Sequence, residues 1–285
     1  RAQALVARAA YPAEKKVVKA RVITCFSLKG GVGVTSLAVN LAVSLAEMWL
    51  CKVALVDLAV NSGQAALFLN LAPRYTLAEL AAEALEDIPH ELGRYLLAHS
   101  SGVSLLSAPR SAAMTQDLSA KLVEAFLPPL QAQFDYVVID TMHHFGEATL
   151  AAIEHSDLLL LILTPHLAGA KATTDAFTVL DSIGYPKQQT LLVLNQSFPQ
   201  EGLPAKQLED VLGSRLVAIL PYEGKSFVDA INRGTPLVTL APNSPTTLTI
   251  QELAFRVSKP EMQRQEGPEI SSLLGRVRKR LASAH

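Results

Sequence analysis

Short, uninterrupted apolar runs recur along this chain and alternate with segments of helical periodicity. A strand that is buried on both faces is apolar throughout, whereas a half-exposed strand alternates apolar and polar residues. The runs here are of the first kind, so they predict a parallel sheet with helices on both faces. They span Val22–Ser27, Lys52–Asp57, Val103–Ser107, Tyr136–Asp140, Leu158–Thr164, Thr190–Asn195 and Leu216–Leu220.

The segments between these runs carry apolar residues every three or four positions, which is typical of amphipathic helices. We expect helices at Val34–Met48, Leu77–Leu85, Leu118–Leu130, Glu147–His155, Ala168–Ile183, Lys206–Leu212, Ser226–Asn232 and Thr246–Val257. The regular alternation of strand and helix predicts one doubly wound α/β domain with a mainly parallel sheet of about seven strands, over residues 21–258.

Composition excludes several classes of protein. With 49% hydrophobic and 18% charged residues among 285, the chain is too apolar to be disordered. It has no uncharged apolar run of the length that a membrane-spanning helix needs. Cys25 and Cys51 form no CxxC pair and indicate no disulfide framework, so we expect a protein of the reducing cytoplasm.

The formal net charge of −1 hides an uneven distribution. Residues 1–21 carry a net +5 and residues 270–285 a net +4, whereas residues 22–269 carry 15 bases and 25 acids, a net −10. An acidic body argues against DNA as the main partner. Because the chain begins at Arg1 with a basic stretch, we expect residues 1–20 to be a linker from a preceding part of the protein.

A glycine-rich loop follows the first strand and leads directly into the first helix, in the sequence FSLKGGVGVTS at Phe26–Ser36. Glycines let backbone N–H groups converge on an anion, and the helix dipole adds positive potential. A strand, such a loop and a helix start together predict a phosphate-binding site. Its candidate residues are Lys29, Gly30, Gly31, Val32, Gly33, Val34, Thr35 and Ser36.

This loop departs from the regular pattern GxxxxGK[ST] at two positions. Leu28 stands where the first glycine belongs, and Val34 stands where the phosphate-binding lysine belongs. A lysine occurs early instead, at Lys29. An early lysine before GGxG resembles the deviant Walker A motif of the MinD/ParA superfamily of P-loop ATPases, and Val56–Leu58, Phe134–Thr141, Leu192–Asn195 and Leu220–Pro221 resemble further motifs of that superfamily.

Two other segments are most similar to the CpaE/TadZ branch, which acts in Flp/Tad pilus assembly: RYTLAEL at 74–80 and AINRGTPL at 230–237. The resemblance implies P-loop NTPase topology over residues 21–258, a homodimer, and partners in a pilus or secretion apparatus. Members of the branch often carry a receiver-like domain before the ATPase-like domain. A cytoplasmic location follows, or a peripheral one at the inner face of the membrane or at a cell pole.

The resemblance also implies roles for single residues. Lys29 matches the lysine that reaches the nucleotide of the partner subunit, Thr35 and Asp140 match Mg²⁺ ligands, and Ser36 matches a phosphate contact. Asn195 and Pro221 match segments that flank adenine, and Asp57 matches the first of two strand-two aspartates. The second, which orients the attacking water, is replaced by Ala59, and a further acidic position reads Gln64.

These departures predict weak or absent nucleotide binding and little ATP hydrolysis. Losing one charge-assisted hydrogen bond weakens binding roughly 10- to 150-fold. The interpretation is therefore a degenerate MinD/ParA-like localisation or scaffolding factor that binds Mg²⁺ with ATP or ADP weakly. Two alternatives stay open, namely an active partitioning ATPase and a plain protein-interaction module.

Two features lie outside this pattern. His143 and His144 follow the Walker B strand, where they are either a polar loop pair or part of a metal site, and the first interpretation is favoured because further ligands are lacking.

Residues 259–285 form a basic tail with an amphipathic helix, which predicts contact with a membrane or a partner unless the helix packs on the body. Its candidate residues are Leu273, Leu274, Arg276, Val277, Lys279 and Arg280.

Overall fold

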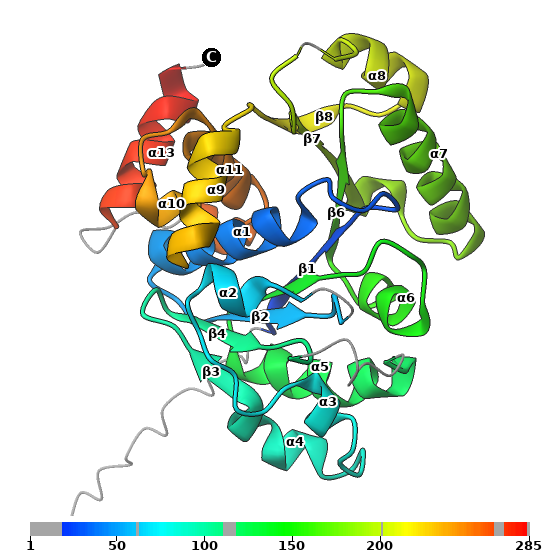
Figure 1. Ribbon diagram of the computed structural model, residues 1–285, viewed down its shortest axis with the longest axis vertical. Helices are drawn as coiled ribbons and strands as arrows, with labels where there is room; N and C mark the ends of the chain where they lie inside the picture. Colours follow the sequence, from blue (N-terminus) through cyan, green and yellow to red (C-terminus); the bar gives the residue numbers. More distant parts are fainter. Residues whose placement is uncertain (1–18, 61–62, 111–117, 201, 265–270, 284–285) are drawn as a thin grey trace, which may run out of the picture.

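A central eight-stranded sheet organises the protein (Figure 1). The computed structural model describes residues 19–60, 63–110, 118–200, 202–264 and 271–283. The strand order is β3-β4-β2-β5-β1-β6-β7-β8, and every pair is parallel except β3 with β4. The strands are β1 (Arg21–Phe26), β2 (Val53–Asp57), β3 (Leu96–Ala98), β4 (Val103–Leu106), β5 (Tyr136–Asp140), β6 (Leu158–Leu163), β7 (Thr190–Asn195) and β8 (Leu216–Leu220).

Helices cover both faces of this sheet, as the continuous apolar strands predict. They are α1 (Val34–Trp49), α2 (Ala65–Phe68), α3 (Leu77–Leu80), α4 (Ile88–Glu91), α5 (Ala120–Gln133), α6 (Glu147–Glu154), α7 (Leu167–Ser182), α8 (Ala205–Leu212), α9 (Gly224–Arg233), α10 (Leu237–Leu240), α11 (Pro245–Arg256), α12 (Pro260–Gln263) and α13 (Ser272–Ser283), with 3-10 turns η1 (Leu92–Tyr95) and η3 (Lys187–Gln189). The predicted doubly wound α/β fold is confirmed.

Successive residues of each central strand enter different cores. On β1, Cys25 belongs to the core beneath α1 and α11, whereas Phe26 belongs to the core beneath α7 and α8. The helices α5 and α6 cover a third cluster against the other half of the sheet. Burial on both faces holds the carboxyl ends of β1, β2 and β5 rigidly at one edge, where ligands of open α/β sheets bind.

The structure corrects two of the expected elements. The helix expected at Leu77–Leu85 ends at Leu80, because Ala82 and Glu83 donate to carbonyls only three residues back and the chain then turns to bury Ile88. An eighth strand, β3, pairs antiparallel with β4. Three residues are too few for strand periodicity to emerge from the sequence.

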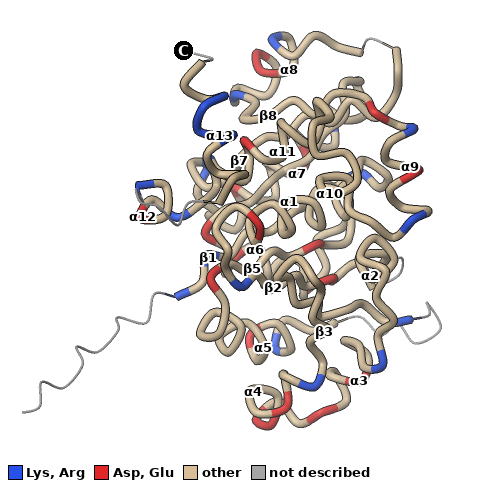
Figure 2. The backbone as a smooth tube through the Cα atoms, turned by 90° about the vertical axis from the view of Figure 1, so that its left-hand side faces the viewer, with Lys and Arg blue, Asp and Glu red and all other residues tan. Residues whose placement is uncertain are grey.

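The C-terminal helix α13 packs on the body against α1 and α11. Leu273, Leu274 and Val277 are buried there, and the Ser271 hydroxyl donates to the carbonyl of Met48 at 2.6 Å. The body covers these apolar residues, as the alternative of a helix packed on the body predicts, and their contact with a membrane or partner stays a prediction. Arg276 and Lys279 stay exposed, and Figure 2 shows the basic stretch of α13 at the periphery of the molecule.

Arg280 also contacts the body and is not part of a fully exposed basic surface. Its guanidinium donates to Glu252 on α11 at 3.1 Å, and the side chain is only partly exposed. The described helices include none that is both long and apolar enough to cross a membrane.

Candidate functional site

The glycine-rich loop joins β1 to α1 at the edge where the central strands end. Gly31 and Gly33 have φ values of +74° and +94°, which side chains rarely adopt. A Cβ on Gly33 would also lie 2.6 Å from Nδ2 of Asn195, so only glycine fits there. The first turn of α1 has no side-chain cap and no acidic residue. Its backbone N–H groups are therefore available to an anion.

A cavity of about 310 Å³ opens in front of this loop. Lys29 and His143 line it, and no carboxylate does so among the described residues. The absence of lining carboxylates makes the cavity suitable for an anionic ligand such as a polyphosphate. The full lining is Lys29, Gly30, Gly31, Gly33, Val34, Thr35, Ser36, Ala59, Gln64, Phe68, Thr141, Met142, His143 and Ile231.

The three departures from the superfamily pattern come together in this one cavity. Val34, Ala59 and Gln64 all line it, although they are widely separated in the sequence. A ligand in the cavity therefore faces a valine, an alanine and a neutral amide where the superfamily pattern has a lysine and two acidic residues. The three substitutions noted in the sequence thus meet at one place in the structure.

Asp140 ends β5 directly behind the loop. Its carboxyl group is completely buried, and neither oxygen makes a hydrogen bond of normal geometry. Burial raises the pKa of Asp140 well above its usual range, and the nearby Asp57 raises it further. The Thr35 hydroxyl is near enough to oppose this shift.

An unpartnered buried carboxylate next to a hydroxyl is the donor set that a hard cation requires. The residues present therefore fit Mg²⁺, with Asp140 and Thr35 as the residues that would hold it. When bound, the cation would neutralise phosphate charge. The chain itself would contribute the backbone N–H groups at the start of α1, which orient an anion.

Asp57 ends the neighbouring strand β2 and is held differently. Its two oxygens accept hydrogen bonds from the backbone N–H groups of Ala59 at 3.1 Å and Ala65 at 3.2 Å. Burial raises the pKa of Asp57 to about 6, and these two bonds oppose the shift. Asp57 therefore anchors the turn that carries Ala59 and the start of α2, which is a structural task.

Three predicted nucleotide-binding residues lie outside the cavity lining. The Val32 side chain is buried, and its carbonyl accepts a hydrogen bond from Nδ2 of Asn195 at 2.8 Å. The Pro221 carbonyl accepts from the Thr246 hydroxyl at 3.0 Å. Asn195 thus fixes the shape of the loop from behind.

Sequence reasoning underestimated His143, which lies in the cavity wall beside the glycine loop. The sequence did indicate this location, because a residue shortly after the Walker B strand lies at the edge of the sheet where ligands bind. The described residues contain no cluster of three or more His, Cys, Asp or Glu side chains that could hold a metal. The metal alternative for the histidine pair therefore has no structural support.

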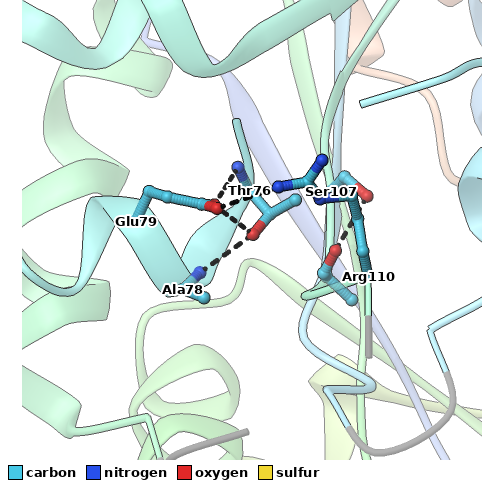
Figure 3. A network of polar contacts seen from close by, with 6 residues as sticks. Thr76, Ala78, Glu79, Ser107 and Arg110 are labelled. Atoms are coloured by element: carbon cyan, nitrogen blue, oxygen red, sulfur yellow. Dashed lines mark hydrogen bonds and ion pairs between the residues drawn. The ribbon is translucent and has the colours of Figure 1, made fainter. Parts of the chain in front are cut away.

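The segment at 74–80 forms a compact cap rather than a ligand site (Figure 3). The Thr76 hydroxyl accepts from the N–H of Ala78 at 3.2 Å, and Glu79 accepts from the N–H of Thr76 at 2.8 Å. Arg110 approaches Glu79 at 3.5 Å. This reciprocal capping fixes the start of α3 on the far side of β2 and β4 from α1.

Comparison with known proteins agrees with this fold and loop. A family model described as AAA domain matches residues 20–190, and the chain belongs to that family. The septum site-determining protein MinD of Thermotoga maritima is 26% identical over 244 residues, which cover 83% of this chain and 87% of MinD. The chain is thereby a member of the MinD/ParA superfamily.

Solved structures share the fold. A ParA family ATPase from Chlorobium tepidum superposes with a TM-score of 0.75 at 19% identity, covering 83% of this chain and 98% of the ATPase. MinD from Pyrococcus horikoshii, solved with Mg-ADP, superposes with a TM-score of 0.73 at 22% identity, covering 87% of this chain and all of that protein. These likenesses confirm the P-loop NTPase topology expected from the sequence.

Proposed function

We propose that this protein is a degenerate MinD/ParA-like factor that positions or scaffolds a pilus or secretion apparatus, as the resemblance to the CpaE/TadZ branch implies. It binds Mg-nucleotide weakly and hydrolyses ATP little or not at all. The observation that carries the proposal is the cavity in which the glycine loop is intact while Val34, Ala59 and Gln64 replace the charged residues. Such a site keeps its shape but lacks groups that stabilise developing charge.

The retained parts of the site support binding rather than turnover. The free N–H groups of α1, the Lys29 ammonium and the buried Asp140 carboxylate suit a phosphate and its cation. Positioning alone, without the lysine and the water-orienting carboxylate, leaves the chemical step unassisted. The nucleotide then serves as a structural ligand of this face.

We propose that this face also forms a homodimer contact, with Lys29 on its rim. Lys29 is only partly buried and lines the cavity, so its ammonium is accessible to a second subunit. The acidic body does not favour DNA as a partner. A location at the inner membrane face or a cell pole would follow from binding to apparatus proteins, since the apolar face of α13 is buried.

Calorimetry of Mg-ATP and Mg-ADP binding tests the proposal, with the parent protein compared to a Val34→Lys variant. We expect weak binding by the parent and roughly 10- to 150-fold tighter binding by the variant, because an ammonium is restored next to the phosphates. An assay for phosphate release should show no significant turnover by the parent. Tight binding with robust hydrolysis by the parent would support an active partitioning ATPase instead.

A further inference from the structure

His143 lies beside Gly30 of the glycine loop and lines the same cavity. An ideal Cβ built on Gly30 would lie 3.6 Å from Cγ of the His143 ring, so a side chain at this position would touch the imidazole. His143 and Lys29 are the lining side chains that can carry a positive charge. The imidazole therefore sits within reach of any group that the loop holds.

The loop that carries His143 is fixed at both ends. The Thr141 hydroxyl donates to the carbonyl of Cys25 at 2.7 Å, which ties the loop to β1. The Phe145 ring packs on Phe26 with centroids 4.7 Å apart, and Met142 is buried between these two anchors. The position of His143 is thus set by the fold, so no rearrangement is needed to bring the ring to the cavity.

The part of the cavity lining that α1 contributes contains no cation. Val34 occupies the position from which a lysine would reach the phosphates, and no other lining residue on α1 is basic. An imidazole N–H can donate to a phosphate oxygen in either tautomer and gives a stronger bond when it is charged. His143 is the described side chain in the wall best placed to supply such a donor.

We propose that His143 binds the phosphate oxygens of a nucleoside di- or triphosphate held by the glycine loop, and so replaces in part the missing lysine. The inference deepens the proposed function, since it rests on nucleotide binding at this cavity. It assigns His143 a binding role and no part in hydrolysis, because none of the described residues that line the cavity is a carboxylate that could orient water.

The neighbouring His144 provides a matched control. Its ring centroid is 6.2 Å from that of His143 and nearly perpendicular to it. His144 lines a separate cavity together with Phe145, Gly146 and Thr149, and not the cavity of the glycine loop. Both histidines are exposed, so truncating either should leave the fold intact.

Calorimetric titration with Mg-ADP of the parent, His143→Ala, His143→Gln and His144→Ala tests the inference. We expect His143→Ala to weaken binding by about 3- to 10-fold, the amount of one hydrogen bond. His143→Gln, which keeps an N–H donor, should fall between parent and alanine variant, and His144→Ala should match the parent. Equal binding by the parent and His143→Ala, or equal losses in the two alanine variants, would overturn the inference and leave the proposed nucleotide binding standing.

The histidine ring signals of the parent give a second readout that needs no substitution of His143. On addition of Mg-ADP, the NMR signals of the His143 ring should shift and those of His144 should stay. A shift of neither ring despite calorimetric binding would overturn the inference. Absence of any binding to the parent would overturn the inference and nucleotide binding together, an outcome distinct from the others.

Discussion

Asp57 and Asp140 occupy paired positions at the carboxyl ends of the neighbouring parallel strands β2 and β5. Both carboxyl groups are buried, and Asp57 raises the pKa of Asp140 in addition to the effect of burial. Val34, which stands where the superfamily pattern has its phosphate-binding lysine, lines the cavity in front of the glycine loop. When both groups are ionised, two like charges share a low-dielectric site, so protonation or a bound Mg²⁺ should stabilise this part of the protein.

The stability of the nucleotide-free protein should fall as the pH rises. The folded-state pKa of Asp57 is about 6 and that of Asp140 is raised as well, whereas an unfolded aspartate has a pKa near 4. Between these values the folded state holds protons that the unfolded chain has released, so the free energy of unfolding decreases from about pH 4 through pH 6 and beyond. Urea denaturation across this range measures the slope.

An Asp140→Asn variant tests whether the Asp140 carboxylate causes this loss of stability at higher pH. The contacts of Asp140 with Thr35 and Thr141 fall short of normal hydrogen-bond geometry, so the substitution removes a buried charge and loses little bonding. We expect the variant to be about 1–3 kcal/mol more stable than the parent at pH 8, with the gain vanishing towards pH 4. A variant that is less stable at every pH would show that Asp140 is satisfied in a way that the structure does not contain.

ATP hydrolysis should return only when two of the lost groups are restored together. A Val34→Lys/Ala59→Asp variant regains an ammonium at the phosphates and a carboxylate that orients water, which together should raise phosphate release by roughly 100-fold or more over the parent. Ala59 is buried beside Asp57, so Ala59→Asp alone adds a third carboxylate and should only lower stability. Turnover by the parent equal to that of the double variant would contradict this.

Lys29 should control self-association. If the ammonium crosses to a second subunit, Lys29→Ala should shift a Mg-ATP-loaded sample towards monomer in analytical ultracentrifugation, without changing the melting temperature. Lys171→Ala is the control, because Lys171 is exposed on α7 and pairs with Asp175 of its own helix. An unchanged dimer fraction in Lys29→Ala would exclude the role carried over from the superfamily.

The sequence predicted the sheet and its covering helices well, because parallel strands that are buried on both faces consist of consecutive apolar residues. It predicted poorly where structure depends on contacts distant in the chain. The end of α3 at Leu80 is set by the burial of Ile88, and the short strand β3 exists only because β4 pairs with it. Neither contact has a local signature in the sequence.

The candidate site likewise has features that the sequence predicted and features that it did not. The glycine loop and the ends of β2 and β5 follow from motif and strand order, and the structure brings Val34, Ala59 and Gln64 to one cavity as the resemblance implies. The sequence placed His143 and His144 at the ligand edge of the sheet, but which of the two lines the cavity of the glycine loop depends on how Phe145 and Thr141 anchor the loop. The structural use of the Asn195 amide likewise depends on a contact with Val32, 163 residues away.

The C-terminal helix should act as part of the core and not as a membrane anchor. Leu274 is buried against the body, so Leu274→Ala should lower the free energy of unfolding by roughly 2–4 kcal/mol, whereas the exposed Lys279→Ala should change it by less than about 0.5 kcal/mol. Urea denaturation measures both values.

The same packing predicts the behaviour of α13 with lipid. Leu273, Leu274 and Val277 are covered, so the exposed side chains that α13 offers to lipid include the charged Arg276 and Lys279, and at physiological salt a few surface charges give weak attraction. The parent and an Arg276→Ser/Lys279→Ser variant should therefore pellet equally little with phosphatidylserine vesicles. Strong pelleting of the parent, together with loss of stability on binding, would mean that α13 leaves the body to enter the bilayer and that its docked position is one of two states.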